Sequence, residues 1–200
     1  MKATILSGQE AAGNILSNLR KKSVGQKLQL AVLQVGSHPV SAAYVQKKKE
    51  AAAAVGIQFL MHSLPSSASQ SDVISTIARL VKNPKVTGLV VQLPLPKHLN
   101  AQAILDSIPL EKDPDVLSSK AFGMFALGMS SILPPTVAAV KKLFEVYKIE
   151  LKGKRVALIG SGRLVGLPLL LWLLQNNATV TALTRSTRNL ASFTRRADIV

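Results

Sequence analysis

The sequence contains no cysteine, and this absence excludes several kinds of site at once. A disulfide scaffold, a thiolate metal centre and a thiol nucleophile all require cysteine. Aromatic residues are also scarce, at 4% of 200 residues, so a core must be built mainly from Ala, Val, Ile and Leu. With 48% hydrophobic residues, the chain still has enough apolar material for one large or two small domains.

The sequence also lacks a hydrophobic run long enough to cross a membrane. Its longest apolar stretch, residues 164–174, contains a glycine and a proline and is too short to span a bilayer. The first residues lack the uninterrupted apolar run of a secretory signal. We therefore expect a soluble, cytoplasmic protein with no membrane partner, although the lack of cysteine alone does not fix the compartment.

Acidic residues are few: 10 Asp and Glu stand against 25 Lys and Arg, giving a formal net charge of +15. Such a surplus can favour nucleic acid, because basic groups displace phosphate counterions. The basic residues are scattered, however, and no aromatic-interleaved patch or known nucleic-acid motif accompanies them. We expect solvated basic faces that attract an anionic ligand, with nucleic-acid binding as the less favoured alternative.

What the sequence does contain is a regular alternation of strand and helix patterns. In the first half, β-rich or buried apolar runs predict strands at 27–36, 57–64 and 86–96. Apolar residues at helical spacing, with capping residues and a terminating glycine, predict helices at 42–55, 69–83 and 100–108. An acidic connector, "PLEKDPDV", follows the last of these.

The second half repeats the alternation. Strands are predicted at 152–160 and 178–184, helices at 135–149, 167–177 and 188–197, and a further strand begins at 198. This order predicts a two-domain α/β protein with parallel sheets and right-handed crossovers. We place the domains at 1–117 and 118–200, and expect the second, Rossmann-like domain to be incomplete because the sequence ends inside a strand.

A glycine-rich loop lies between a predicted strand and helix, with Gly160, Gly162 and Gly166 spaced one residue wider than the usual dinucleotide fingerprint. Such a turn lets backbone N–H groups approach a pyrophosphate, although the glycines could also serve only tight packing. The next strand is followed by Arg185 and Arg188 and carries no carboxylate. That favours NADP over NAD, unless both arginines are merely exposed loop charges.

In the first half, three separated pieces carry candidate chemistry. Ser41, Tyr44 and Lys48 lie in one predicted helix, and the four-residue spacing of Tyr44 and Lys48 puts them on one face. A lysine beside a phenol and partly removed from water can act as a base. Gln92 ends an apolar strand, and Asp115 lies near the domain division, where a cleft is expected. Singly, each has an ordinary alternative: a surface lysine, an edge glutamine, a loop aspartate.

Taken together and in order, the motifs resemble one family. "VGSHPVSAAYVQKKKEAAAAVGI", "GLVVQLPLP", "EKDPD", "LPPT", "GSGRLVGLP" and "NNATVTALTRSTRNL" are similar to the successive signatures of bifunctional methylenetetrahydrofolate dehydrogenase/cyclohydrolase. The similarity runs in register along the whole chain. It implies an enzyme that transfers a hydride from methylenetetrahydrofolate to NADP and then hydrolyses the methenyl product to formyltetrahydrofolate.

The resemblance also implies roles for the residues of the first domain. Lys48 matches the central catalytic lysine, which acts in proton transfer and activation of water, and Tyr44 matches the tyrosine that stacks on the folate. Gln92 matches the glutamine that hydrogen-bonds near the lysine. Asp115 matches the aspartate that holds the pterin ring. The resemblance further assigns substrate binding to Tyr44, Lys48, Val91, Gln92, Leu93 and Asp115.

For the second domain, the resemblance implies that Gly160, Ser161 and Gly162 contact NADP and that Arg185 lies near its 2′-phosphate. No metal is expected. The implied partners are tetrahydrofolate derivatives, including those with a glutamate-extended tail that a basic surface would attract. The family usually forms homodimers through its cofactor domain.

The sequence departs from the family pattern at four places. Val116 replaces a glycine after Asp115, which would strain the turn if that position needs a positive φ. Val137 replaces a proline, and Ser161 stands where many members have arginine. The sequence also ends at Val200, inside the cofactor sheet. An alternative is therefore a fragment or a catalytically impaired relative that keeps the fold as a folate- or nucleotide-binding or dimerising protein.

Overall fold

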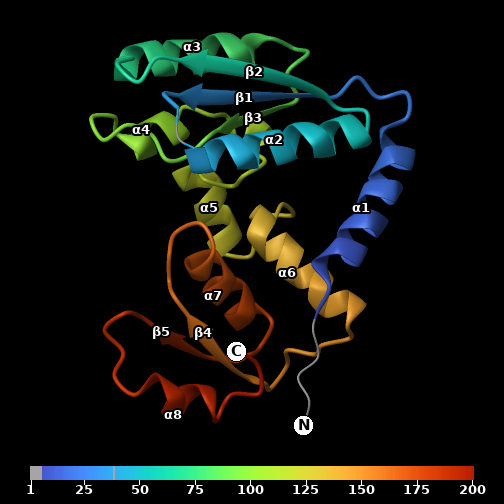
Figure 1. Ribbon diagram of the computed structural model, residues 1–200, viewed down its shortest axis with the longest axis vertical. Coiled ribbons are helices and arrows are strands. Elements are labelled where there is room, and N and C mark those ends of the chain that lie inside the picture. Colours follow the sequence, from blue (N-terminus) through green and yellow to red (C-terminus); the bar gives the residue numbers. More distant parts are fainter. Residues whose placement is uncertain (1–5, 38) are drawn as a thin grey trace. The chain divides into compact units, whose positions relative to one another are not determined.

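The computed structural model describes residues 6–37 and 39–200 (Figure 1). The chain forms two compact units, one spanning Ala12–Gly123 and the other combining Met124–Val200 with the described N-terminal residues 6–11. Within the described ranges, no helix is long and apolar enough to cross a membrane.

The first unit is built on a three-stranded parallel sheet with the order β2-β1-β3. The strands are β1 (Gln29–Val35), β2 (Gln58–Leu64) and β3 (Gly88–Val91), and the crossover helices are α2 (Pro39–Ala54) and α3 (Gln70–Lys82). Figure 1 shows α3 over one face of this sheet and α2 over the other. This layering follows from the sequence, since parallel strands require crossover connections that cover the faces of the sheet.

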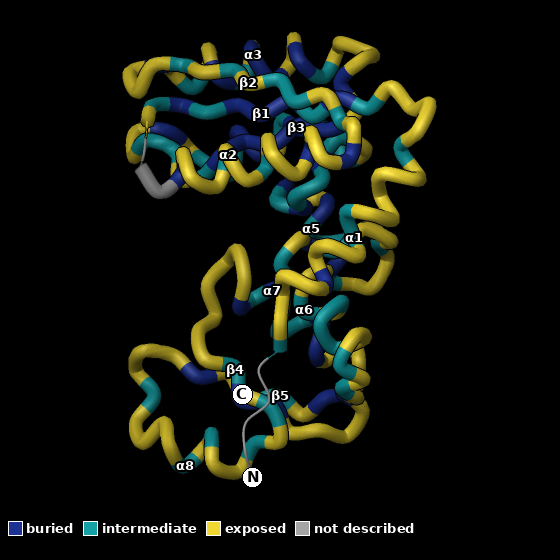
Figure 2. The backbone as a smooth tube through the Cα atoms, turned by 45° about the vertical axis from the view of Figure 1, so that its right-hand side comes forward, coloured by how far each residue is buried: buried dark blue, intermediate teal, exposed yellow. Residues whose placement is uncertain are grey.

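The main core of this unit lies between the sheet and α3. Leu33 of β1 is in register with Val91 of β3, so the two side chains share one face of the sheet. Both belong to the same buried cluster as Val73 and Ile77 of α3, and Figure 2 shows β1 as mostly buried, whereas β2 is intermediate or exposed. A capping box between Ser69 and Asp72 fixes the start of α3.

Strand β3 is shorter than predicted: it ends at Val91 instead of near residue 96. The N–H of Gln92 still donates to the carbonyl of Leu33, but the prolines that follow have no N–H to continue the ladder. Three short helical segments come next: α4 (Ala101–Leu105), the 3₁₀ turn η1 (Leu110–Lys112) and α5 (Ser119–Ala126).

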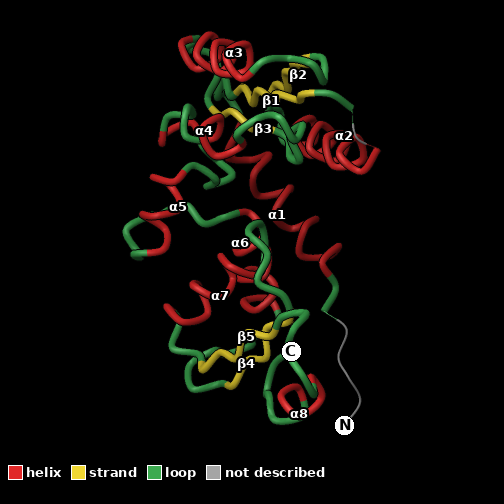
Figure 3. The backbone as a smooth tube through the Cα atoms, turned by 90° about the vertical axis from the view of Figure 1, so that its left-hand side faces the viewer, coloured by secondary structure: helices red, strands yellow, loops and turns green. Residues whose placement is uncertain are grey.

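The second unit holds a smaller parallel sheet made of β4 (Arg155–Ile159) and β5 (Thr179–Leu183). Its helices are α6 (Pro135–Val146), α7 (Gly166–Gln175) and α8 (Leu190–Thr194), and Figures 1 and 3 show α7 and α8 on opposite sides of the sheet. The end of the chain adds a bridge from Ile199 to Val156, as the predicted further strand requires. Val137, where the family pattern has proline, is fully buried in α6 and so fits the core.

Two helices were not predicted. α1 (Gly8–Ser23) has two glycines and buries only Ala11, and α5 contains Gly123 and lacks an acidic first turn. Glycine lowers the helix propensity of both segments, although each has apolar residues at helical spacing. Helix α2 is longer than predicted: it begins at Pro39 instead of Ala42, since proline suits the first turn of a helix. The predicted helix at 188–197 shrinks to Leu190–Thr194.

Candidate functional site

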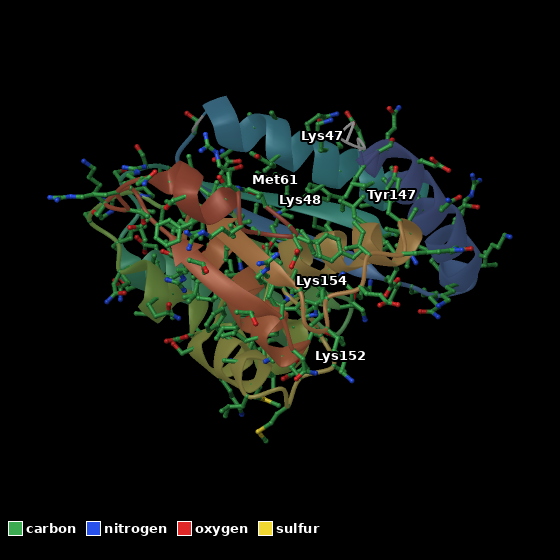
Figure 4. All side chains as sticks on the ribbon, turned by 90° about the horizontal axis from the view of Figure 1, so that it is seen from below. Lys47, Lys48, Met61, Tyr147, Lys152 and Lys154 are labelled. Carbon is green, nitrogen blue, oxygen red and sulfur yellow. The ribbon has the colours of Figure 1, made fainter. Side chains whose placement is uncertain are left out.

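Lys48 differs from its two lysine neighbours in its surroundings. Lys47 and Lys49 are exposed, whereas the Lys48 side chain retains 34% of its accessible surface. Consecutive residues of an α-helix point in directions about 100° apart, and Figure 4 labels Lys47 and Lys48 at separate positions beside α2. The helix therefore presents one lysine of the triplet toward the protein, and it is the one that the four-residue spacing from Tyr44 selected.

The partner of Lys48 is Asp115. The Nζ of Lys48 lies 3.7 Å from Oδ2 of Asp115, whose side chain is 23% exposed. Burial raises the pKa of the Asp115 carboxyl, the charge of Lys48 opposes that rise, and the nearby Asp113 carboxylate adds to it. The structure thus joins an amine from α2 to a carboxyl group that is held in an unusually dry position.

The turn that carries Asp115 is organised by a second aspartate. Asp113 is only 4% exposed, and its carboxylate accepts hydrogen bonds from the backbone N–H groups of Leu117 and Ser118. Val116, which lies between Asp115 and Leu117, is buried and has φ of +55°. A β-branched residue in this region is strained, so the strain predicted for a valine at this position is present.

At the end of β3, Gln92 is almost fully buried, with 9% of its surface exposed. Its Nε2 donates to the carbonyl of Leu93, while its Oε1 is buried and has no hydrogen-bond partner among the described residues. A buried acceptor without a partner is uncommon and is typical of a position that a ligand or water completes. Ser41 of α2 also donates to the Leu93 carbonyl, at 3.3 Å, which ties the helix to this segment.

The structure brings some of the predicted residues together and leaves others apart. Lys48 and Asp115 form an ion pair, but within the described part of the chain no hydrogen bond joins Tyr44 to Lys48 or either residue to Gln92. Tyr44 is 62% exposed and so is open to a planar ligand. Val91 is buried in the core cluster, so only its backbone is available to a substrate, and Leu93 is half-buried.

Sequence reasoning missed Asp113. Its signal was the spacing of "DPD", in which two acidic residues flank a proline in an otherwise basic protein. Buried carboxylates that accept backbone N–H groups commonly fix turns, and such a pair in a connector is a reason to look for one.

In the second unit, the loop after β4 has the geometry of a tight strand-to-helix turn. Gly160 has φ of +95°, and its N–H donates to the carbonyl of Leu183 at the end of β5. A Cβ at Gly166 would lie 2.0 Å from the carbonyl oxygen of Gly160. The close packing of loop and helix therefore requires glycine at both positions.

This loop has unused hydrogen-bond donors. In the described ranges, the N–H groups of Ser161 and Gly162 donate to no protein acceptor, and both residues are exposed. The start of α7 has no side-chain cap, so its positive end is open as well. After β5, a turn closed by Thr184 and Thr187 presents Arg185 to solvent. These groups fit a dinucleotide with a pyrophosphate and a 2′-phosphate.

Both halves of the chain match one family. Residues 6–115 match the model described as the catalytic domain of tetrahydrofolate dehydrogenase/cyclohydrolase, and residues 134–200 match that of its NAD(P)-binding domain. The chain belongs to the tetrahydrofolate dehydrogenase/cyclohydrolase family. The resemblance carried by the motifs and the predicted two-domain α/β fold with parallel sheets are therefore confirmed.

Individual members of the tetrahydrofolate dehydrogenase/cyclohydrolase family agree with this assignment. The bifunctional protein FolD of Nautilia profundicola is 38% identical over 202 residues, which are 98% of this chain and 71% of that protein. The FolD protein of Nitrosospira multiformis is 38% identical over 206 residues, with 100% and 71% of the two chains covered.

Solved structures of this family show the same fold. The bifunctional FolD dehydrogenase/cyclohydrolase of Campylobacter jejuni has a TM-score of 0.93 at 35% identity, covering 98% of this chain and 73% of its own. The Trypanosoma brucei methylenetetrahydrofolate dehydrogenase-cyclohydrolase, solved with NADP cofactor and an inhibitor, has a TM-score of 0.93 at 31% identity. It covers 100% of this chain and 72% of its own.

Proposed function

We propose that this protein oxidises methylenetetrahydrofolate with NADP and hydrolyses the resulting methenyl group to give formyltetrahydrofolate. Family membership of both halves supports this function. The single structural observation that carries it is the pairing of Lys48 with Asp115 at 3.7 Å, since it puts an amine beside a carboxyl group raised in pKa by burial. An arrangement of this kind suits proton transfer and recognition of a polar ring.

Asp115 is the residue that we assign to hold the pterin ring. The ring presents an amino group and a ring N–H along one edge, and a carboxylate can accept hydrogen bonds from both. Tyr44 would stack on the ring with its exposed aromatic face. Gln92 would use the unpaired Oε1, which needs a donor, and Val91 and Leu93 would line the substrate through the segment around it.

Lys48 is the group that we assign to proton transfer in the hydrolysis. Water adds to the methenyl carbon, and the added water must lose one proton. In its neutral form, the amine of Lys48 takes this proton and gives it to N5 as the bond from that nitrogen to the carbon breaks, while the second proton of the water is released. The Lys48–Asp115 pair keeps the amine in place during these steps.

NADP is the cofactor of the dehydrogenase reaction. Gly160, Ser161 and Gly162 would hold its pyrophosphate through backbone N–H groups, and Arg185 its 2′-phosphate. When bound, NADP accepts the hydride that leaves the methylene carbon. The residues present fit this ligand, because the strand before Arg185 ends without the carboxylate that would bind a free 2′-hydroxyl.

We assign the folate-binding catalytic domain to residues 1–117 and the NADP-binding domain to residues 118–200, a functional division that differs from the compact units, which divide after Gly123. The test of the function is a direct assay of the purified protein with methylenetetrahydrofolate and NADP, following NADPH by absorbance. Decay of methenyltetrahydrofolate, measured in a separate reaction, tests the hydrolysis. Absence of both reactions, together with calorimetric binding of NADP or folic acid, would instead support the non-catalytic alternative.

We also propose a cytoplasmic location and a homodimer. The lack of cysteine suits a reducing compartment such as the cytoplasm. Separately, the net charge of +15 would attract folate substrates with glutamate-extended tails. Light scattering on the purified protein tests the dimer, and cell fractionation tests the location. A monomer at all concentrations would remove the dimer from the proposal without affecting the chemistry.

A further inference from the structure

We propose that Asp113 is a positioning residue for the folate site: its buried carboxylate holds the turn that keeps Asp115 opposite Lys48. This inference rests on the proposed function, in which Asp115 holds the pterin ring. Asp113 itself would touch neither substrate nor cofactor. Its effect would pass through the backbone of the turn from residue 113 to residue 118.

The contacts of Asp113 close this turn on itself. Oδ2 accepts the N–H of Leu117 at 3.1 Å and the N–H of Ser118 at 2.9 Å, and Oδ1 lies 3.4 Å from the Leu117 nitrogen. The backbone carbonyl of Asp113 also accepts the N–H of Val116, at 3.4 Å. All three N–H donors follow Asp115, so one residue that precedes Asp115 binds the backbone on its far side.

The turn is also fixed to the rest of its unit. The Lys112 amine donates to the carbonyls of Val81 and Asn83 at the end of α3. A Cβ at Gly88 of β3 would lie 3.5 Å from the ring of Pro114, which places that proline directly against the strand. With these anchors before and within the turn, Asp113 supplies the bonds that fix the chain after Asp115.

Val116 explains why such bonds are needed. Its φ of +55° is a conformation that a β-branched residue adopts only when its surroundings impose it. A relaxed backbone at this residue would rotate the peptide beside Asp115 and move that carboxylate. The hydrogen bonds from Leu117 and Ser118 to Asp113 oppose this relaxation, since both donors lie beyond Val116.

The charges around Asp115 agree with the same arrangement. Lys48 from α2 and Asp113 from its own turn face Asp115, and the second carboxylate contributes to the raised pKa of the first. Repulsion between the two carboxylates favours the pairing of Asp115 with the opposite charge of Lys48. Asp113 thus acts on Asp115 both through the backbone and through its charge.

The first experiment replaces Asp113 and asks whether the effect depends on Asp115. Asp113→Ala should lower kcat/KM for methylenetetrahydrofolate by about ten- to a hundredfold, through KM for folate, and leave KM for NADP within about twofold. In an Asp115→Asn background the same replacement should cost less than about twofold, because its target is already lost. Equal losses in both backgrounds, or an equal rise in KM for NADP, would overturn the proposal.

Asp113→Asn is the conservative variant, and it covers the case in which the alanine variant does not fold. An asparagine oxygen can still accept the Leu117 and Ser118 N–H groups. Asp113→Asn should therefore lose less kcat/KM than Asp113→Ala, and the loss should show the same dependence on Asp115.

Asp106→Ala is the matched control. Asp106 accepts the N–H of Ser119 at 2.6 Å, in the same region but beyond the Asp115 turn. A loss equal to that of Asp113→Ala would reduce Asp113 to a general structural role.

A crystal structure of Asp113→Ala, which loses the bonds to Leu117 and Ser118, provides a readout that does not depend on turnover. The separation between the Lys48 amine and the Asp115 carboxylate, 3.7 Å in the native chain, should exceed the limit of an ion pair, about 4 Å. An unchanged separation would overturn the positioning role even in a fully active enzyme. If the variant loses the pair but the native protein shows no turnover, the positioning role stands and the result counts against the proposed function alone.

Discussion

The amine of Lys48 and the carboxylate of Asp115 lie 3.7 Å apart, although one comes from an alanine-rich helix and the other from an irregular connector. Neither residue is distinctive alone, since lysines on helix faces and aspartates in loops are common. Their contact makes them functional candidates, because burial raises the pKa of Asp115 while Lys48 opposes the rise. The chemistry assigned to the N-terminal unit depends on this pair.

Replacing Lys48 should therefore separate chemistry from folding. Lys48→Met should lower the hydrolysis of methenyltetrahydrofolate by about 10²–10⁴-fold, since a proton-transfer group is lost. The stability loss should be about 1 kcal/mol or less, because the pair is partly exposed and methionine keeps the apolar stem. Methenyl decay and urea unfolding measure the two effects.

Lys47→Met is the matched control for this prediction. Lys47 precedes Lys48 on the same helix but is exposed, and it forms no ion pair with any of the described residues. Its activity should stay within about twofold of the native value, as for a surface substitution. Similar losses from the two variants would show that the charge of the triplet matters and that Lys48 has no special position.

The raised pKa of Asp115 gives a pH dependence of stability with a definite sign. Because the folded carboxyl binds its proton more tightly than the unfolded one, stability should fall as pH rises from 3.8 toward the raised folded pKa. Asp115→Asn removes this fall. The free energy of unfolding of Asp115→Asn, relative to that of the native chain, should therefore be higher at pH 7 than at low pH. Urea unfolding at several pH values measures this difference. A constant difference across that range would contradict the raised pKa.

The sequence was sufficient to predict much of this protein for simple reasons. Apolar runs and turn residues predicted the strands of both units, and the four-residue spacing from Tyr44 selected Lys48 over its neighbours. The position of Gln92 at the end of β3 followed from the same pattern, since the carboxyl ends of parallel strands lie where ligands bind. These patterns involve residues close together in the chain, so they can be recognised from the sequence alone.

What could not be predicted depends on contacts between distant segments. No periodicity in the sequence connects Asp115 to Lys48, and the burial of Asp113 arises only after the connector folds against α3 and β3. Helix α5 was missed because it is short and contains Gly123, although its buried residues Ala121 and Phe125 lie one helical turn apart. The sequence predicted strain at Val116 only if that position has a positive φ, and the value of φ becomes known only from the structure.

The cofactor preference predicts a separate effect at Arg185. Arg185→Ala should weaken NADP by about tenfold or more, since hydrogen bonds to a charged phosphate contribute about 1.5–3 kcal/mol, and should change NAD little. Arg195→Ala is the control, because it removes the same charge from an exposed position at the end of α8. Kinetics with both nucleotides measure the preference. If both variants weaken NADP alike, the effect belongs to net charge and Arg185 is not part of the site.

The strain at Val116 predicts an unusual result for a buried valine. Replacing a buried valine by glycine costs its burial, about 1.5–3 kcal/mol, plus the entropy of the new glycine. At Val116, glycine also relieves about 1–3 kcal/mol of backbone strain. Val116→Gly should therefore destabilise less than Val86→Gly, where the valine is equally buried and φ is not positive. Equal costs in urea unfolding would show that Val116 is relaxed.

The glycine loop supplies the last prediction. Gly166→Ala would place a methyl group 2.0 Å from the Gly160 carbonyl oxygen, so loop and helix must separate. Overpacking of this kind costs about 1–3 kcal/mol or more, and the shift should also weaken NADP. Gly162→Ala is the matched control for stability, because a Cβ there meets nothing within 4 Å and its φ is not positive. Urea unfolding should show a loss at Gly166 that exceeds the loss at Gly162 by at least about 1 kcal/mol, and equal losses would mean that the loop gives way without cost.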